Sequence, residues 1–278
     1  MRIFMVSDIE GLTGVYHWAQ TKPGNPAYDE ARELLMGDLL AAVEGAHDGG
    51  VDEIVVYDMH ESGRNIFTDR LPAYVRHIAG KPPVLTEEFR MGKSYDGLFM
   101  LGNHAMPFTR DSVLCHAYWL SDGMFTVNGI DVGEIGMEAL IAGQYGVPLL
   151  LVTGDLAAKK EALALSPDTR CAVVKESSGY RNTAVCYPAC ETQEEIYRQA
   201  RDAVKHASEI APVTLQAPYT LRFTFRGQVR PEIKALPGIA AIDDKTYELK
   251  GGDLQDVGAG KRRLLQLAGC LALRKIRL

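Results

Sequence analysis

The distribution of hydrophobic residues divides roughly the first 175 residues of the chain into alternating strands and helices. Val, Ile and Leu are concentrated in short apolar runs, which are typical of strands buried on both faces of a sheet. Two longer segments carry apolar residues at helical spacing, residues 28–47, which are followed by Gly49-Gly50, and residues 134–145. The alternation predicts an α/β fold, with a mostly parallel sheet flanked by helices. The predicted strands are residues 2–7, 53–57, 97–101, 112–115, 148–153 and 171–175.

The pattern changes after Pro188, where a smaller unit is predicted. A long helix is expected at residues 191–209, and the strands and helix that follow it are expected at residues 219–226, 246–250 and 254–278. Earlier in the chain, Asn128-Gly129 lies between apolar residues and predicts a hairpin turn. We therefore expect a catalytic α/β domain at residues 1–190 and a smaller α+β domain at residues 191–278.

Acidic residues or histidines directly follow four of the predicted strands. Open α/β sheets bind ligands at the carboxyl ends of their strands, so these side chains are expected to meet in one crevice. Taken singly, a strand-end Asp is usually a cap, and a lone His is usually a core or surface residue. Taken together, two carboxylates and two or three imidazoles indicate a site for Zn(II) or a similar ion. The residues are Asp8, Glu10, Asp58, His60, Asn103, His104 and His116.

Neighbouring residues keep simpler interpretations open. Glu134 begins a predicted helix, where an acid interacts favourably with the helix dipole. Asp58 is either a turn residue or a partner that orients a ligand histidine. Cys115 immediately precedes His116, but neighbours on a strand point to opposite faces, so Cys115 is expected in the core and not in a nucleophilic pair.

Composition and charge exclude several classes of protein. The 278 residues carry a formal net charge of −6, which argues against a nucleic-acid-binding surface. No apolar run approaches the roughly 18 residues that span a membrane, and the N-terminus has no signal-peptide pattern. The 5 cysteines, an odd number, indicate free thiols in a reducing cytoplasm. Gly11-Leu12-Thr13-Gly14 lacks the further residues of nucleotide-binding loops, which disfavours an NAD-linked oxidoreductase.

A set of motifs, in the same order along the chain, resembles one enzyme family, the zinc-dependent D-aminopeptidases encoded with dipeptide-transport genes (the DppA metallopeptidase family). Residues 7–11 resemble the first signature of that family, which contains Asp-x-Glu-Gly. The resemblance continues to the end of the chain, although it is weak beyond Lys175. The other matching motifs are Asp58-Met59-His60, Gly102-Asn103-His104-Ala105, His116, Gly133-Glu134-Ile135-Gly136 and Val152-Thr153-Gly154-Asp155.

The resemblance implies a site with two zinc ions and a peptidase activity. Asp8 would bridge the two metals, and His116 would be the catalytic residue. Family members remove N-terminal D-residues such as D-Ala from short peptides, and they form large homo-oligomeric rings, for which a decamer is the candidate size, around an inner chamber. The implied metal ligands are Asp8, Glu10, His60, His104 and Glu134.

Two segments depart from the pattern of the family, and two other functions stay open. The segments that contain residues 106–111 and 175–181 are each one residue longer, which affects the expected residue preference more than the metal chemistry. A two-metal phosphoesterase or amidohydrolase would need a basic residue for an anionic substrate, such as Arg64, Arg110 or Arg181. A non-catalytic oligomer that binds metal or peptide is the other alternative.

Overall fold

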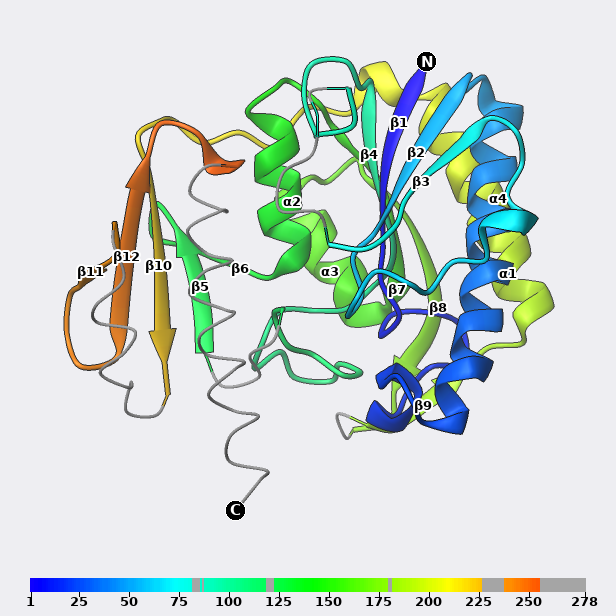
Figure 1. The fold of residues 1–278 in the computed structure, drawn as a ribbon, viewed down its shortest axis with the longest axis horizontal. Coiled ribbons are helices and arrows are strands. Elements are labelled where there is room, and N and C mark those ends of the chain that lie inside the picture. Colours follow the sequence, from blue (N-terminus) through cyan, green and yellow to red (C-terminus); the bar gives the residue numbers. More distant parts are fainter. Residues whose placement is uncertain (82–85, 87, 119–122, 180–181, 227–237, 256–278) are drawn as a thin grey trace.

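Two β-sheets and two pairs of α-helices make up the described part of the protein (Figure 1). The computed structural model describes residues 1–81, 86, 88–118, 123–179, 182–226 and 238–255. In the larger sheet, parallel pairing joins every pair of neighbouring strands except β8 and β9, which are antiparallel. This arrangement confirms the predicted α/β fold with a mostly parallel sheet. The order across the sheet is β3 (Val75–Ile78), β2 (Glu53–Asp58), β1 (Arg2–Ser7), β4 (Gly97–Asn103), β7 (Leu149–Asp155), β8 (Arg170–Ser177) and β9 (Ala184–Cys186).

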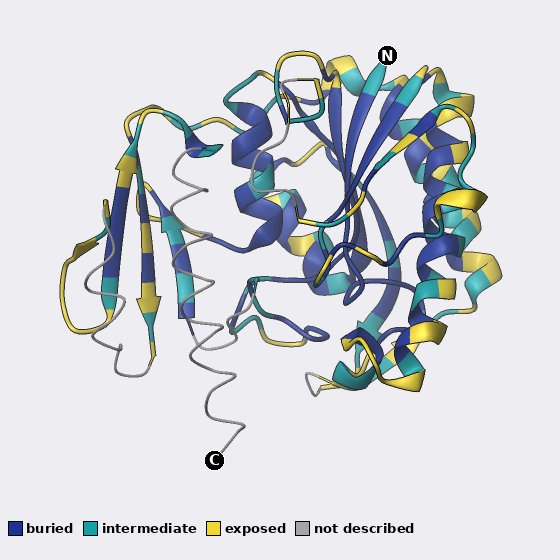
Figure 2. Ribbon diagram, in the orientation of Figure 1, coloured by how far each residue is buried: buried dark blue, intermediate teal, exposed yellow. Residues whose placement is uncertain are grey.

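Helices cover both faces of the larger sheet, which explains why its central strands are buried along their length (Figure 2). Helices α1 (Pro26–Gly49) and α4 (Ala189–Lys205) pack together on one face, and α2 (Glu134–Gly143) and α3 (Leu156–Leu165) lie on the other. A side chain at Gly45 would place its Cβ 2.2 Å from the carbonyl oxygen of Tyr197, so only glycine permits this close approach of α1 and α4. Short 3₁₀ helices span Trp18–Thr21, Thr68–Arg70 and Ala207–Glu209.

The smaller sheet is antiparallel and lies beyond α2. It combines the hairpin of β5 (Gly123–Val127) and β6 (Ile130–Val132) with strands from the end of the chain. The predicted turn is confirmed, because Asn128 and Gly129 have positive φ angles of 50° and 86°, as a type I′ turn requires. The order is β11 (Ala240–Ala241), β12 (Thr246–Gly251), β10 (Tyr219–Phe225), β5 and β6.

The expected division of the chain at residue 190 follows neither sheet. Strands β5 and β6 of the smaller sheet come before this point, whereas α4, which begins at Ala189 and extends beyond it, packs against α1 in the larger unit. The division into two domains stays a prediction. The helix expected at residues 254–278 lies almost entirely outside the described residues. Among the helices that are described, none is long and apolar enough to cross a membrane.

One predicted strand is wrong. Residues 112–115 form a loop instead, in which Leu114 has a φ angle of 52° that no strand accommodates. The loop is attached to the end of β7, because the amide of Val113 donates a hydrogen bond of 2.6 Å to the carboxylate of Asp155. The apolar run at this position reflects burial in the core, since Val113, Leu114 and Cys115 are fully buried. Cys115 is therefore a core residue, as expected, although not on a strand.

Candidate metal centre

The loops after β1 and β4 are pressed together at the carboxyl end of the sheet. The amide of Gly11 donates a hydrogen bond of 2.7 Å to the carbonyl oxygen of Gly102. A Cβ at Gly11 would lie 1.9 Å from the carbonyl oxygen of Asn103, so a larger residue would force the two loops apart. This contact brings Asp8 and Glu10, which lie after β1, next to His104, which follows β4.

Five of the predicted site residues form two groups that share Asp8. In the first group, the Nδ1 atom of His60 lies 2.9 Å from Oδ1 of Asp8 and 3.0 Å from Oε2 of Glu10. In the second group, the Nε2 atom of His104 lies 3.4 Å from Oδ2 of Asp8 and 3.3 Å from Oε1 of Glu134. All five side chains are buried, and within each group the donor atoms lie within 4.8 Å of one another.

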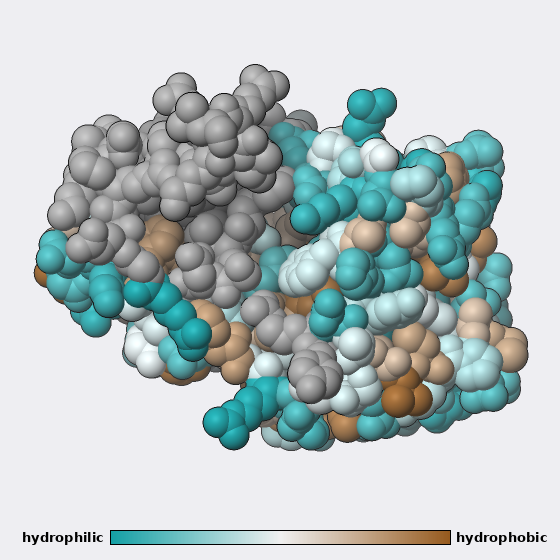
Figure 3. Space-filling view, turned by 90° about the horizontal axis from the view of Figure 1, so that it is seen from below, coloured by the Kyte–Doolittle hydropathy of each residue, from teal (hydrophilic) through white to brown (hydrophobic). Residues whose placement is uncertain are grey.

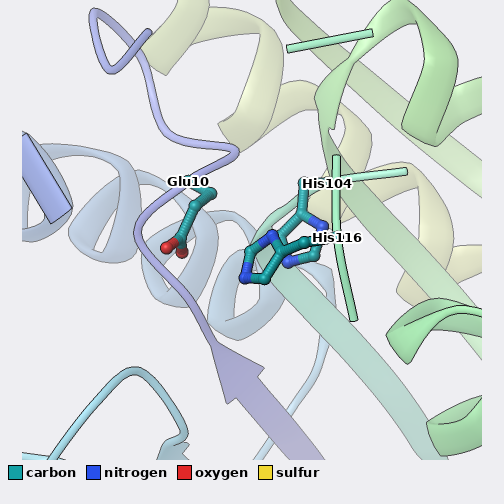
Figure 4. A group of neighbouring side chains, drawn as sticks. All are labelled: Glu10, His104 and His116. Carbon is teal, nitrogen blue, oxygen red and sulfur yellow. The ribbon is translucent and has the colours of Figure 1, made fainter. Parts of the chain in front are cut away.

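His116 joins the same cluster even though the strand predicted before it is a loop. Its ring stacks on that of His104, with centroids 4.0 Å apart and an interplanar angle of 18°. Figure 4 shows the carboxylate of Glu10 on one side and the two stacked imidazoles on the other. Glu10, His104 and His116 also place one donor atom each within 4.8 Å of one another. The edge of the Trp18 ring contacts His116, with centroids 5.2 Å apart.

Each of the three imidazoles has one nitrogen next to a backbone carbonyl and leaves the other for the site. His60 pairs through Nε2 with the carbonyl oxygen of Thr21 at 2.7 Å. His104 and His116 pair through Nδ1 with the carbonyl oxygens of Ala105 at 3.1 Å and Leu114 at 2.8 Å. A carbonyl oxygen can only accept, so these nitrogens carry the proton. The opposite nitrogen is then free to bind a metal, as in many zinc sites.

The electrostatics of the cluster favour bound positive charge. Burial disfavours the charged form of His60 and His104, but the adjacent carboxylates outweigh it and raise the pKa of both imidazoles well above the usual range. Burial also opposes ionisation of Asp8 and Glu134, whereas the neighbouring histidines lower the pKa of each carboxyl group. In His116, burial and the charge of His104 lower the pKa. The carboxylates that favour positive charge on His60 and His104 would also favour a bound metal cation.

The donor set fits zinc. Three carboxylates and two imidazoles, with His116 beside them, are the nitrogen and oxygen ligands that Zn(II) prefers in catalytic sites. Oε2 of Glu10 and Nε2 of His104 are buried atoms without a hydrogen bond of good geometry. Buried polar atoms are rarely left in this state, and a bound cation would satisfy both.

Asp58 supports the cluster without contacting it. Its carboxylate accepts hydrogen bonds of 2.6 Å from the backbone amide and the side-chain amide of Asn65. The side chain of Asn65 in turn donates a hydrogen bond of 2.9 Å to the carbonyl oxygen of His60. Asp58 thus fixes the loop that carries His60, which combines the two interpretations left open by the sequence.

Two charged residues near the site were not identified as site residues from the sequence. The ammonium of Lys175, fully buried on β8, donates hydrogen bonds to the carbonyl oxygens of Glu10, Leu12 and Val15. The buried carboxyl group of Glu161, on α3, accepts a hydrogen bond of 2.6 Å from the amide of Met106. The sequence did contain a signal for both residues. Lys175 interrupts the apolar run of β8, and Glu161 lies on the alanine-rich buried face of α3.

Comparisons with known proteins show the family to which the chain belongs. A model of the peptidase family M55, described as D-aminopeptidase, matches residues 1–259. A D-aminopeptidase of Bacillus subtilis (strain 168) is 27% identical over 214 residues, which cover 77% of each chain. A solved structure, the Zn-dependent D-aminopeptidase DppA from Bacillus subtilis, a self-compartmentalizing protease, superimposes with a TM-score of 0.90 at 25% identity, over 96% of this chain and 98% of that one. The chain therefore belongs to the D-aminopeptidase family, and it is a metal-dependent aminopeptidase.

Proposed function

We propose that this protein removes the N-terminal residue of short peptides, preferably a D-residue such as D-Ala, with two zinc ions bound per subunit. Asp8, Glu10 and His60 would hold one ion, and Asp8, His104 and Glu134 would hold the other. The observation that carries the proposal is the pair of buried donor groups that share Asp8, whose two oxygens face the two groups separately. When bound, two such ions activate water and polarise a peptide carbonyl.

We assign proton transfer during hydrolysis to His116. Its Nδ1 proton is directed to the carbonyl oxygen of Leu114, so Nε2 is the atom that accepts and returns a proton. Burial lowers the pKa of His116, which keeps the imidazole neutral near pH 7 and available as a base. The stacked ring of His104 and the edge of Trp18 fix its orientation. The same Nε2 can then protonate the leaving amine.

The relatives support the substrate class and the assembly. The matched proteins are named D-aminopeptidases, and the solved one is called self-compartmentalizing. We infer the same preference for an N-terminal D-residue here, together with a homo-oligomeric ring that encloses the active sites. The number of subunits, including the decamer suggested by the resemblance, and the cytoplasmic location are further predictions.

A metal analysis combined with a substrate panel tests the proposal. The purified protein is expected to contain two zinc ions per chain and to hydrolyse D-Ala peptides and D-alaninamide faster than the L-Ala forms. Chelation should abolish turnover, and added zinc should restore it. Phosphate esters belong in the same panel, because their hydrolysis in place of peptides would favour a phosphoesterase. Bound zinc without any turnover would instead indicate a non-catalytic metal-binding protein.

A further inference from the structure

A second feature, a cavity of about 480 Å³, is lined in part by Cys115, the residue before His116, and has no role in the chemistry described above. Its wall is the loop that connects His104 to His116, together with the end of β8 and the end of β10. Two guanidinium groups, of Arg110 and Arg226, face it, as do the hydroxyl-bearing residues Thr109, Ser112 and Ser177. Asp111 also lines it, so two positive charges stand against one negative charge.

The loop that forms the cavity is strained and anchored, which is typical of a functional surface. Phe108 and Asp111 both have φ angles in the left-handed region, 66° and 53°, which are rare for residues other than glycine. The guanidinium of Arg226, directly after β10, lies over the ring of Phe108, 3.5 Å from its centroid. This cation–π contact holds the loop against the smaller sheet. Residues 106–111 belong to this loop, which connects His104 to His116.

The position of the cavity matches the far end of a short peptide. Cys115 lines the cavity and is bonded directly to His116, so the cavity begins next to the catalytic cluster. Ser177 ends β8, which lies two strands from β4, the strand that carries His104. Neighbouring strands are about 4.8 Å apart, so the two ends are separated by about 10 Å across the sheet. An extended peptide spans about 3.3–3.6 Å per residue, so about three residues bridge this distance.

The polar groups of the cavity select an anion with planar oxygens. Within the described part of the chain, neither Arg110 nor Arg226 forms an ion pair with a carboxylate. A guanidinium binds a carboxylate through two parallel hydrogen bonds, and the nearby hydroxyl groups can donate further ones. At the far end of a short peptide, the group with this chemistry is the C-terminal carboxylate.

We propose that this cavity binds the free C-terminal carboxylate of a substrate of about three residues, with Arg110 and Arg226 as its receptors. The inference rests on the proposed peptidase function and adds a reason for selecting short peptides. A longer or amidated peptide would place a neutral group at the two guanidinium groups. Such a substrate loses these contacts while its N-terminal residue still reaches the metal centre.

The test compares tri-D-alanine with its C-terminal amide, on wild-type protein and on the variants Arg110→Met and Arg226→Met. Hydrogen bonds to charged groups predict that wild-type kcat/KM is about 10–100-fold higher for the free acid, mainly through KM. Each variant should lower this acid-to-amide ratio by about tenfold through the loss of one charged partner. The matched control is Arg222→Met, because Arg222 lies on the same strand β10 but is paired with Glu248. It should keep the wild-type ratio.

Binding provides a second measurement that does not depend on turnover. With zinc removed, calorimetry should detect tighter binding of tri-D-alanine than of its amide by wild-type protein, and the difference should disappear in the double variant. Equal kcat/KM for acid and amide in wild type, or variants that slow both equally, would overturn the proposal. D-alaninamide is measured alongside, because it is too short to reach the cavity. If it too is not hydrolysed, the proposed function itself has failed, and the calorimetric comparison then decides the carboxylate site.

Discussion

The ammonium group of Lys175 donates a hydrogen bond of 2.6 Å to the backbone carbonyl oxygen of Glu10, a residue 165 positions away. It donates two further hydrogen bonds, to the carbonyl oxygens of Leu12 and Val15. Burial lowers the pKa of Lys175 to about 8, but three acceptors require three donors, which only the charged form supplies. Lys175 thus closes the loop after β1 and sets the direction in which Glu10 points.

Lys175→Met should weaken zinc binding selectively. Methionine fills most of the space but leaves three buried carbonyl oxygens without a donor, which should lower the free energy of unfolding by about 2–5 kcal/mol. The ion held by Asp8, Glu10 and His60 should be lost at lower chelator concentration, while the ion at Glu134 stays. Zinc release against a graded chelator measures this, with Lys160→Met, an exposed lysine on α3, as the control. Unchanged release of both ions in a folded variant would contradict the positioning role.

His60→Ala and His104→Ala should each remove a different zinc ion. The two histidines belong to separate donor groups, so each variant should retain about one ion per chain at near wild-type affinity. Asp8→Asn should impair both ions, because Asp8 belongs to both groups. Metal content after dialysis against a weak chelator is the measurement. His206→Ala, at the end of α4, serves as the control. Two tightly bound ions in either histidine variant would refute the ligand assignment.

The sequence was sufficient for those parts of the site that depend on local pattern. Strands β1, β2 and β4 are continuous apolar runs, and their polar ends meet because parallel strands share one edge. The strand predicted at residues 112–115 was wrong because a short apolar run is equally typical of a buried strand and of a buried loop. The loop at residues 112–115 is packed in the core and hydrogen-bonded to Asp155, and it places His116 against the ring of His104.

Other parts of the site depend on contacts between distant segments. The partners of Lys175 lie in the loop after β1, and Glu161 meets Met106 across 55 positions. A pattern along the chain identifies such a residue as an unusual buried charge, but it does not name its partner. The smaller sheet illustrates the same limit. The hairpin of β5 and β6 followed from Asn128-Gly129, whereas its pairing with β10 brings together segments separated by the whole of β7, β8 and α4.

Glu161→Gln should change how stability depends on pH. Burial raises the pKa of Glu161 from 4.5 to about 7, although the Met106 amide partly opposes this. The folded protein therefore keeps a proton that the unfolded chain loses, so stability should fall as pH rises from about 4.5 to 7, by about 3 kcal/mol at most. The variant cannot ionise and should lack this part of the fall. Urea unfolding of the chelated protein between pH 5 and 8 measures the difference.

A matched variant separates this effect from the other titrating groups of the site. Glu194→Gln removes an exposed carboxylate on α4, and its unfolding curves should follow those of the wild type across the range. The groups at the metal centre titrate in all three proteins and cancel in the comparison. If the stability of Glu161→Gln runs parallel to that of the wild type, Glu161 does not hold a proton in the folded state.

His116→Ala should separate metal binding from turnover. The five other residues supply both donor groups, so zinc content should stay at two ions per chain. Loss of the proton-accepting Nε2 atom should lower kcat by about 10²–10⁴-fold, the usual range for acid–base catalysis. His206→Ala, a histidine at the end of α4 and outside the cluster, is the control. Unchanged kcat would remove His116 from the mechanism. Loss of an ion would instead make it a ligand, through its group with Glu10 and His104.

Glu134→Gln distinguishes a metal ligand from a helix-start acid. Glu134 is the first residue of α2, where a negative charge interacts with the helix dipole by about 0.3–1 kcal/mol. Its Oε1 atom also accepts a hydrogen bond of 2.6 Å from the amide of Tyr118, which a glutamine oxygen can accept equally. If these are its only roles, the variant should lose little stability and no activity.

As a ligand, Glu134 is expected to behave differently. The substitution keeps its size but replaces an anionic donor 3.3 Å from Nε2 of His104 by a neutral amide. The affinity for the second zinc ion should then fall by at least about tenfold, a typical effect of perturbing a metal site, and hydrolysis of D-Ala peptides should fall with it. Excess zinc should restore part of the activity by mass action. The control is Glu138→Gln, one turn further along α2, whose carboxylate lies outside both donor groups. It should retain both ions and full activity. Full activity of Glu134→Gln at trace zinc, with a small fall in Tm, would return Glu134 to the role of a helix-start acid.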